Sequence, residues 1–145
     1  MDNADSLIVP LLQGFSWFDD GLQAYLEAKG WPQATRPQSM VMIHVVRGIT
    51  RPIDIARSLG VSRQAIHTTI SQMIELDLLA LEHDSIDGRS KRVVITPNGL
   101  KMRAAANDAM LHMAAALEDR IGARCVEAMR HAFAADWGPP LTTFD

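Results

Sequence analysis

The side chains best suited to recognising another molecule follow a predicted turn in the middle of the chain, in the segment PIDIARSLGVSRQAIHTTI (52–70) and just beyond it. They are polar residues near the start of a predicted helix: Arg63, Gln64, His67, Thr68 and Ser71. Gln can form two hydrogen bonds with adenine, Arg two with guanine, and Thr can offer its methyl group to thymine or its hydroxyl to a base edge. Ser62 and the free amides of the helix start can bind a phosphate. The simpler alternative is that these are solvated positions on an amphipathic helix.

Three residues meet the steric needs of a helix-turn-helix, and they favour the DNA-reading interpretation of the whole set. Ala56 is small where two helices approach closely, and Gly60, four residues later, permits a tight turn. Ile66, six residues further, is a buried anchor on the second helix. In a helix-turn-helix the N-terminal part of this second helix enters the major groove of DNA.

A charged stretch, DSIDGRSKRVVIT (84–96), carries its charges in the hairpin loop between two short predicted strands, 78–82 and 92–96, and ends with the second of them. Such charges are typical of a solvated hairpin loop, so the stretch alone does not indicate a function. After a helix-turn-helix, however, it predicts a wing in which Lys91 and Arg92 contact the DNA backbone and Asp84 remains a solvated strand-end residue. Arg51, at the start of the first helix of the motif, is a further predicted phosphate contact.

The rest of the chain is predicted to be helical. The first helix should be interrupted near Gly14 and Gly21, Thr50 should cap the helix that begins at Arg51, and Thr96 should cap the helix that begins at Pro97. Ser62 caps the helix that carries the stripe Ile66, Ile70 and Met73. The predicted helices cover 7–29, 38–47, 51–59, 63–77, 97–119 and 123–135. The fold class is therefore mainly α with a small β-hairpin, a winged helix-turn-helix flanked by N- and C-terminal helices.

Composition indicates one globular domain, residues 1–145, with 48% hydrophobic and 21% charged residues. The single cysteine, Cys125, fits a reducing cytoplasm, MDNADS does not open like a secretory signal, and no apolar run can span a membrane. Although the net charge is −3, residues 47–103 hold nine Lys/Arg against six Asp/Glu, a balance of +3. The flanks hold five against eleven, or −6. This asymmetry predicts a basic working surface on an acidic scaffold.

The stretch from Gln38 to Gly99 resembles the MarR family (multiple antibiotic resistance-type regulators). The matching residues are Gln38 at the head of a helix and the motifs IDIARSLGVSRQAIHTTISQMIELDLL, DGRSKRVVIT and TPNGL, about 60 of the 145 residues. The resemblance implies a homodimer in which the regions 5–35 and 100–145 interlock, while two lobes of residues 36–99 bind a palindromic operator in double-stranded DNA.

The resemblance also implies roles for single residues. Asp87 and Arg89 match the family's wing pair, in which the Arg enters the minor groove and the Asp helps to hold it. Two departures stand out: Thr68 occupies a position where many members carry Arg, and Asp77 one where a Gly often ends the recognition helix. Asp adopts the left-handed conformation more readily than most residues, so the fold should tolerate it.

An aromatic-rich segment has two interpretations. Phe15, Trp17, Phe18, Tyr25 and Trp31 fall within seventeen positions, a density typical of a core or a dimer interface. The alternative is the wall of an effector pocket, since family members bind small aromatic ligands. The residues predicted for this pocket are Trp17, Tyr25, Trp31, Met40 and His44.

No other chemistry is predicted. The five histidines show no pair at helical metal-binding spacing, Cys125 lies away from the sensing position of peroxide-responsive family members, and no nucleophile, zinc or nucleotide motif occurs. We therefore expect no enzyme activity, cofactor or metal. The prediction is a cytoplasmic, dimeric, ligand-responsive transcriptional regulator; the alternative is a winged-helix protein-interaction module without DNA binding.

Overall fold

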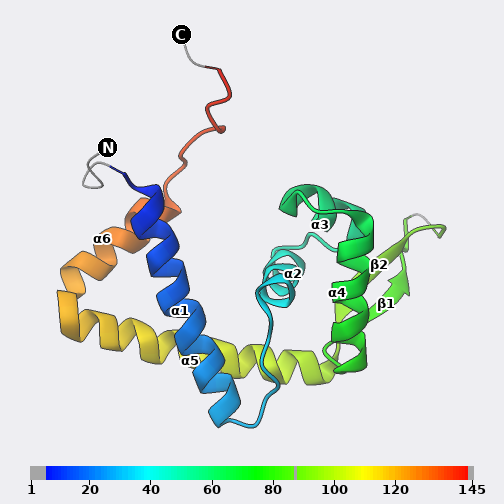
Figure 1. The fold of residues 1–145 in the computed structure, drawn as a ribbon, viewed down its shortest axis with the longest axis horizontal. Coiled ribbons are helices and arrows are strands. Elements are labelled where there is room, and N and C mark those ends of the chain that lie inside the picture. The colour runs from blue at the N-terminus through cyan, green and yellow to red at the C-terminus, as the bar shows by residue number, and fades with distance from the viewer. Residues whose placement is uncertain (1–5, 87, 144–145) are drawn as a thin grey trace. The chain divides into compact units, whose positions relative to one another are not determined.

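The computed structural model of the chain describes residues 6–86 and 88–143, and in these ranges it is mainly helical with one two-stranded sheet (Figure 1). This confirms the predicted fold class. The elements are α1 Ile8–Ala28, α2 Arg36–Val46, α3 Pro52–Leu59, α4 Arg63–Glu75, β1 Leu79–His83, β2 Lys91–Ile95, α5 Pro97–Ile121 and α6 Ala123–Ala134. The chain divides into two compact units, Met1–Ala109 and Met110–Asp145, and α5 runs from one into the other.

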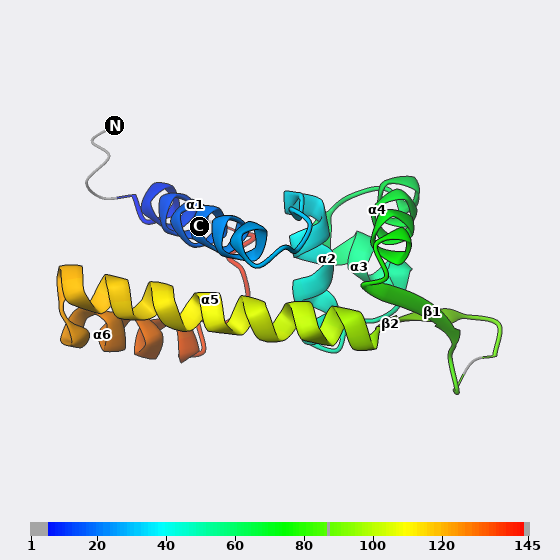
Figure 2. The same ribbon diagram turned by 90° about the horizontal axis from the view of Figure 1, so that it is seen from below.

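The core of the first unit joins α2, α3 and α4 to the sheet. Its members are apolar side chains that the sequence places at helical or alternating spacing, and nearly all are shielded from water: Val41, Val45, Ile55, Ala56, Ile66, Ile70, Met73, Leu79 and Val93. Burial of this contiguous set provides the main stabilisation of the lobe, since each large aliphatic side chain contributes about 1.5–3 kcal/mol. The three helices and the hairpin are thus one packed body (Figures 1 and 2).

The turn between α3 and α4 has the predicted geometry. Gly60 has φ 66° and ψ 32°, a left-handed conformation that glycine adopts without steric cost. Ser62 then caps α4, since its side chain accepts a hydrogen bond from the Ala65 amide at 3.1 Å. The predicted cap of α3 was wrong: α3 begins at Pro52, and the capping position belongs to Arg51, which makes no side-chain cap.

The hairpin strands pair in antiparallel register from Leu79–Ile95 to His83–Lys91, about one residue from the predicted bounds. Thr96 links the sheet to α5, because its hydroxyl accepts from the Gly99 amide at 2.9 Å and donates to the Asp77 carbonyl at 2.5 Å. The sequence predicts that Thr96 caps α5, and this prediction is confirmed. Asp77 has φ 56°, the left-handed conformation expected of it.

Gly99 is buried in the first turn of α5, where the helix approaches the end of the α4–β1 connection. A Cβ at this position would lie 2.2 Å from the Leu78 carbonyl oxygen and 2.8 Å from Ile95 Cγ2. The close approach of α5 to the hairpin therefore requires a residue without a side chain.

α1 is a single helix of 21 residues, so the predicted interruptions at Gly14 and Gly21 were wrong. One helical glycine costs only about 1 kcal/mol relative to alanine, which a long helix can bear. The C-terminal part of α1 joins a second cluster, in which Leu26, Leu78 and Met102 are buried and Leu22 and Trp31 pack against them.

The second unit contains the end of α5 and α6. Val126 is its buried apolar side chain on α6, and Arg130 pairs with Glu118 and Glu127 at 3.5 and 3.4 Å. Several large apolar side chains of this unit remain at least one third exposed: Met110, Leu111, Ile121, Met129, Phe133, Trp137 and Leu141.

Candidate nucleic-acid interface

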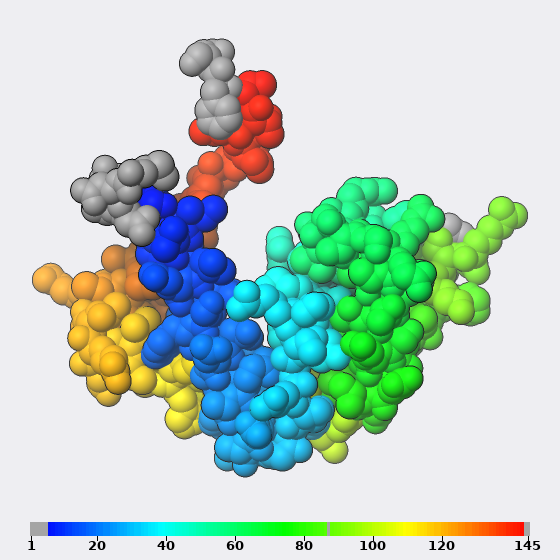
Figure 3. Space-filling view, in the orientation of Figure 1, coloured from blue at the N-terminus to red at the C-terminus, as the bar shows by residue number. Residues whose placement is uncertain are grey.

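The predicted reading residues lie together on one face of α4. The helix buries Ile66, Ile70 and Met73, which are 3%, 1% and 2% exposed. Away from this stripe, the helix exposes five polar side chains to solvent: Arg63, Gln64, His67, Thr68 and Ser71. Figure 3 shows α4 (green) at the surface of the lobe, beside the hairpin. A single helix thus presents an arginine and four other hydrogen-bonding side chains outward, a set able to read base edges.

Two of the hydroxyls on this helix are already engaged by the backbone. The Thr68 hydroxyl donates to the Gln64 carbonyl at 3.0 Å, the usual back-bond of a helical threonine. Its hydrogen is therefore used within the helix, and the group best placed for contact is the side-chain methyl. The Ser62 oxygen accepts from Ala65, so it acts first as a helix cap.

The hairpin brings the predicted wing cations to one projecting element. Arg89 and Lys91 are exposed, and Arg92 on β2 pairs with Glu82 on β1 at 3.2 Å. Asp87, the predicted brace of Arg89, lies outside the described residues.

The prediction for Asp84 was wrong, because its side chain is only 12% exposed and does not stand in solvent. Its Oδ2 accepts from Arg51 Nη2 at 2.7 Å and from Arg51 Nε at 3.0 Å, and its Oδ1 accepts from the Ile86 amide at 2.9 Å. The sequence predicts separate roles for the two residues, a phosphate contact for Arg51 and a solvated strand end for Asp84. They lie 33 residues apart, and no local periodicity pairs residues across such a distance.

The residues predicted for an effector pocket have different environments. Trp17 is 41% exposed on α1, whereas Trp31 packs on the second cluster. His44 is buried, and its ring bridges two helices: Nδ1 bonds the Met40 carbonyl and Nε2 the Ser58 hydroxyl, each at 2.8 Å. Both ring nitrogens thus have partners within the protein, so His44 has a structural role between α2 and α3.

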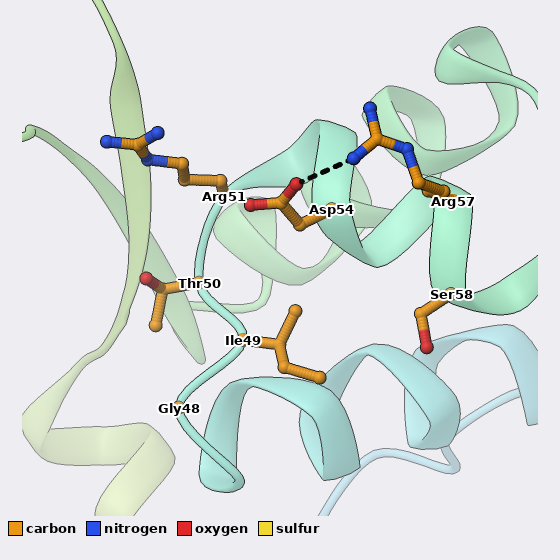
Figure 4. A pocket seen from close by; sticks show the side chains of 7 residues that line it. All are labelled: Gly48, Ile49, Thr50, Arg51, Asp54, Arg57 and Ser58. Carbon is orange, nitrogen blue, oxygen red and sulfur yellow. Dashed lines mark hydrogen bonds and ion pairs between the residues drawn. The ribbon is translucent and has the colours of Figure 1, made fainter. Parts of the chain in front are cut away.

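A shallow depression of about 580 Å³ lies instead at the α2–α3 connection (Figure 4). Its walls are Gly48, Ile49, Thr50, Arg51, Asp54, Arg57 and Ser58. Asp54 and Arg57, one turn apart on α3, pair at 3.5 Å, and both are well exposed. None of the residues predicted for an effector pocket lines it.

Two other properties follow from the described part of the chain. Within residues 6–86 and 88–143, no three His, Cys, Asp or Glu side chains gather closely enough to hold a metal ion. In the same ranges, no helix is both long and apolar enough to cross a membrane.

Comparison with known proteins identifies the fold. No family model and no curated protein sequence matches the chain. Among solved structures, a mutant of MarR from E. coli superposes with a TM-score of 0.68 at 15% identity, over 88% of this chain and 93% of that one. A mutant of MepR from S. aureus, bound to an oligodeoxyribonucleotide, gives 0.58 at 17% identity, over 89% and 94%. BpsR from Bordetella bronchiseptica gives 0.57 at 18% identity, over 94% and 99%.

Proposed function

We propose that this chain, which has the winged-helix fold of MarR-type regulators, is a sequence-specific DNA-binding transcriptional regulator without enzyme activity. The observation that carries the proposal is the exposed polar face of α4, held outward by a buried stripe and preceded by a left-handed glycine turn. A helix with these properties, next to a hairpin bearing cations, fits the major groove of duplex DNA. The MepR structure contains bound DNA, which supports the same activity for this fold.

In the proposed complex, base contacts come from Arg63, Gln64, His67, Thr68 and Ser71. The free amides at the start of α4, together with Ser62, contact phosphate, and Lys91 and Arg92 contact the backbone from the hairpin. Arg89 enters the minor groove, where an arginine responds to groove width, with Asp87 as its brace. Phosphate contacts set the register, and the α4 side chains supply the sequence preference.

We further propose a cytoplasmic homodimer that binds a palindromic operator. Support comes from the second unit, where Leu111, Phe133, Trp137 and Leu141 are 69%, 54%, 66% and 81% exposed. Apolar surface of this extent is typical of a protein interface. At the N-terminal end of α1, Leu7, which precedes the helix, and Ile8 and Leu12 within it are likewise 78%, 75% and 58% exposed. Sedimentation should give twice the chain mass of 16.0 kDa; a monomer at micromolar concentration would contradict the dimer.

A small ligand is proposed to modulate DNA binding, since 6-hydroxynicotinic acid regulates DNA binding by BpsR, a protein of the same fold. Its site is proposed around Trp17, Tyr25, Trp31, Met40 and His44. Titration calorimetry with aromatic acids tests ligand binding separately from DNA binding. A Trp31→Ala variant then tests whether the ligand binds at the proposed site.

The test of DNA binding is selection of duplexes from a random pool, followed by affinity measurement against salt. With about four cationic contacts per subunit, a dimer releases counterions from about eight phosphates, so affinity should fall by about 10³–10⁵ between about 50 and 200 mM salt. A protein that selects no duplex, or one whose affinity barely depends on salt, would favour the alternative of a protein-interaction module.

A further inference from the structure

The hairpin is joined to the segment that precedes α3 by two bonds of different kinds. One is the ion pair of Arg51 with Asp84, in which two guanidinium nitrogens donate to one carboxylate oxygen. The other is a backbone hydrogen bond from the Val93 amide to the Thr50 carbonyl at 2.8 Å. In Figure 4, the Arg51 side chain extends from the α2–α3 connection toward the strand that passes beside Thr50.

The ion pair lies in a position where it restrains the wing. The Asp84 side chain is 12% exposed and that of Arg51 40%, so the charges are partly removed from water and their attraction is less screened than on an open surface. Asp84 also shapes the hairpin itself, because its amide donates to the Ser90 carbonyl at 2.8 Å and its Oδ1 accepts from Ile86. One carboxylate thus connects the loop of the wing to the first helix of the helix-turn-helix.

We propose that Arg51 and Asp84 are positioning residues that set the angle of the wing relative to α4, and that Arg51 does not serve as a phosphate contact. The inference rests on the proposed function and reassigns one residue within it. With the Arg51–Asp84 ion pair intact as a brace, the wing cations stay directed at the DNA backbone while α4 occupies the major groove. Without the ion pair, the sheet remains paired, but of the two bonds described above only the one from the Val93 amide to the Thr50 carbonyl still ties it to the segment before α3.

The Asp84→Asn variant distinguishes a positioning role of Arg51 from a phosphate contact, because the two roles predict opposite changes in DNA affinity. The amide oxygen can still accept from Ile86, but the charge that holds Arg51 is lost. If Arg51 contacts phosphate, removing a competing carboxylate should tighten DNA binding. If the pair is a brace, binding should weaken by about tenfold, the factor that about 1.4 kcal/mol represents. Glu82→Gln is the matched control, because it removes one exposed carboxylate from β1 and should leave binding unchanged or slightly tighter.

Arg51→Lys provides a second, milder variant that keeps the charge. Lysine lacks the fork of donors that Arg51 directs at Asp84, so the brace predicts weaker binding, whereas a phosphate contact predicts little change. Combining Arg51→Gln with Asp84→Asn should cost no more than either change alone, since both remove the same interaction.

The measurement uses the full chain and a duplex selected by the wild type, with affinity followed across salt concentrations well below each variant's unfolding temperature. Asp84→Asn should lower the slope of log affinity against log salt, because wing contacts to phosphate are lost; a purely structural role would leave that slope unchanged. Binding by Asp84→Asn as tight as the wild type, or tighter, overturns the inference and leaves the proposed function intact. If the wild type binds no duplex, both fail.

Discussion

Replacing Gly99 with alanine should destabilise the first unit through one defined collision. The new Cβ would lie 2.2 Å from the Leu78 carbonyl oxygen, well inside the distance of about 3.3 Å at which carbon and oxygen meet even in close C–H···O contacts. Because the neighbour is backbone, relief requires α5 to move away from the α4–β1 connection by about 1 Å. That movement weakens the hydrogen bond from the Thr96 amide to Leu78, now 3.1 Å.

The magnitude follows from three contributions. Overpacking of a buried site costs about 1–3 kcal/mol, and a weakened hydrogen bond adds about 1 kcal/mol. The higher helix propensity of alanine offsets up to about 1 kcal/mol of this loss in stability. The net loss in the free energy of unfolding is therefore about 1–3 kcal/mol, which for a chain of this length corresponds to a melting temperature lower by about 3–10 °C.

Gly14→Ala is the matched control, because the same chemical change occurs inside a helix with space around it. Among the described residues, nothing lies within 4 Å of a Cβ built on Gly14. It should raise the free energy of unfolding by about 0.5–1 kcal/mol. Both variants are compared with the wild type at equal protein concentration by circular dichroism and urea titration. A Gly99→Ala protein that unfolds at or above the wild-type temperature would refute the close approach on which the argument rests.

Three further changes test other contacts. Ser62→Ala removes the cap of α4 and should cost about 1 kcal/mol in urea titration, with Ser62→Asp retaining most of the stability; equal stability of Ser62→Ala and the wild type would argue against the cap. Ser58→Ala leaves His44 Nε2 without its described partner and should cost about 1–3 kcal/mol, measured the same way, whereas no loss would mean that water replaces the hydroxyl. Thr68→Ser should weaken binding to a selected duplex about fourfold per half-site, from about 0.8 kcal/mol for one methyl group, while Thr68→Val should not. Replacing the contacted thymine with uracil should abolish that difference, and independent effects of the two changes would contradict methyl recognition.

The helix-turn-helix could be predicted from sequence because local chemistry determines it. Gly60 supplies the left-handed turn, Ser62 the cap, and the spacing of Ile66, Ile70 and Met73 assigns the buried face of α4. The exposed positions of the reading residues then follow from the 3.6-residue repeat of a helix. Asp77 shows the same principle, since its left-handed conformation was expected from the conformational range of aspartate.

Long-range contacts and competing local signals set the limit of that prediction. Asp84 belongs to a charged loop by composition, and only the folded lobe brings it to Arg51. Gly14 and Gly21 read as helix breakers, yet the helix continues because its other residues favour it. Thr50 has the side chain of a cap, but its carbonyl accepts from β2 and the helix begins later, at Pro52.

The bond between Thr50 and Val93 also bears on self-association. In an antiparallel pair, alternate amides of a strand face away from the partner, and on β2 these belong to Lys91, Val93 and Ile95. The middle one donates to Thr50, so the outer edge of β2 is occupied at its centre by the chain's own backbone. A short strand with a charged end and a covered centre is a poor template for adding a strand from another molecule. The outer edge of β2 can therefore lie at the side of the hairpin without promoting edge-to-edge aggregation.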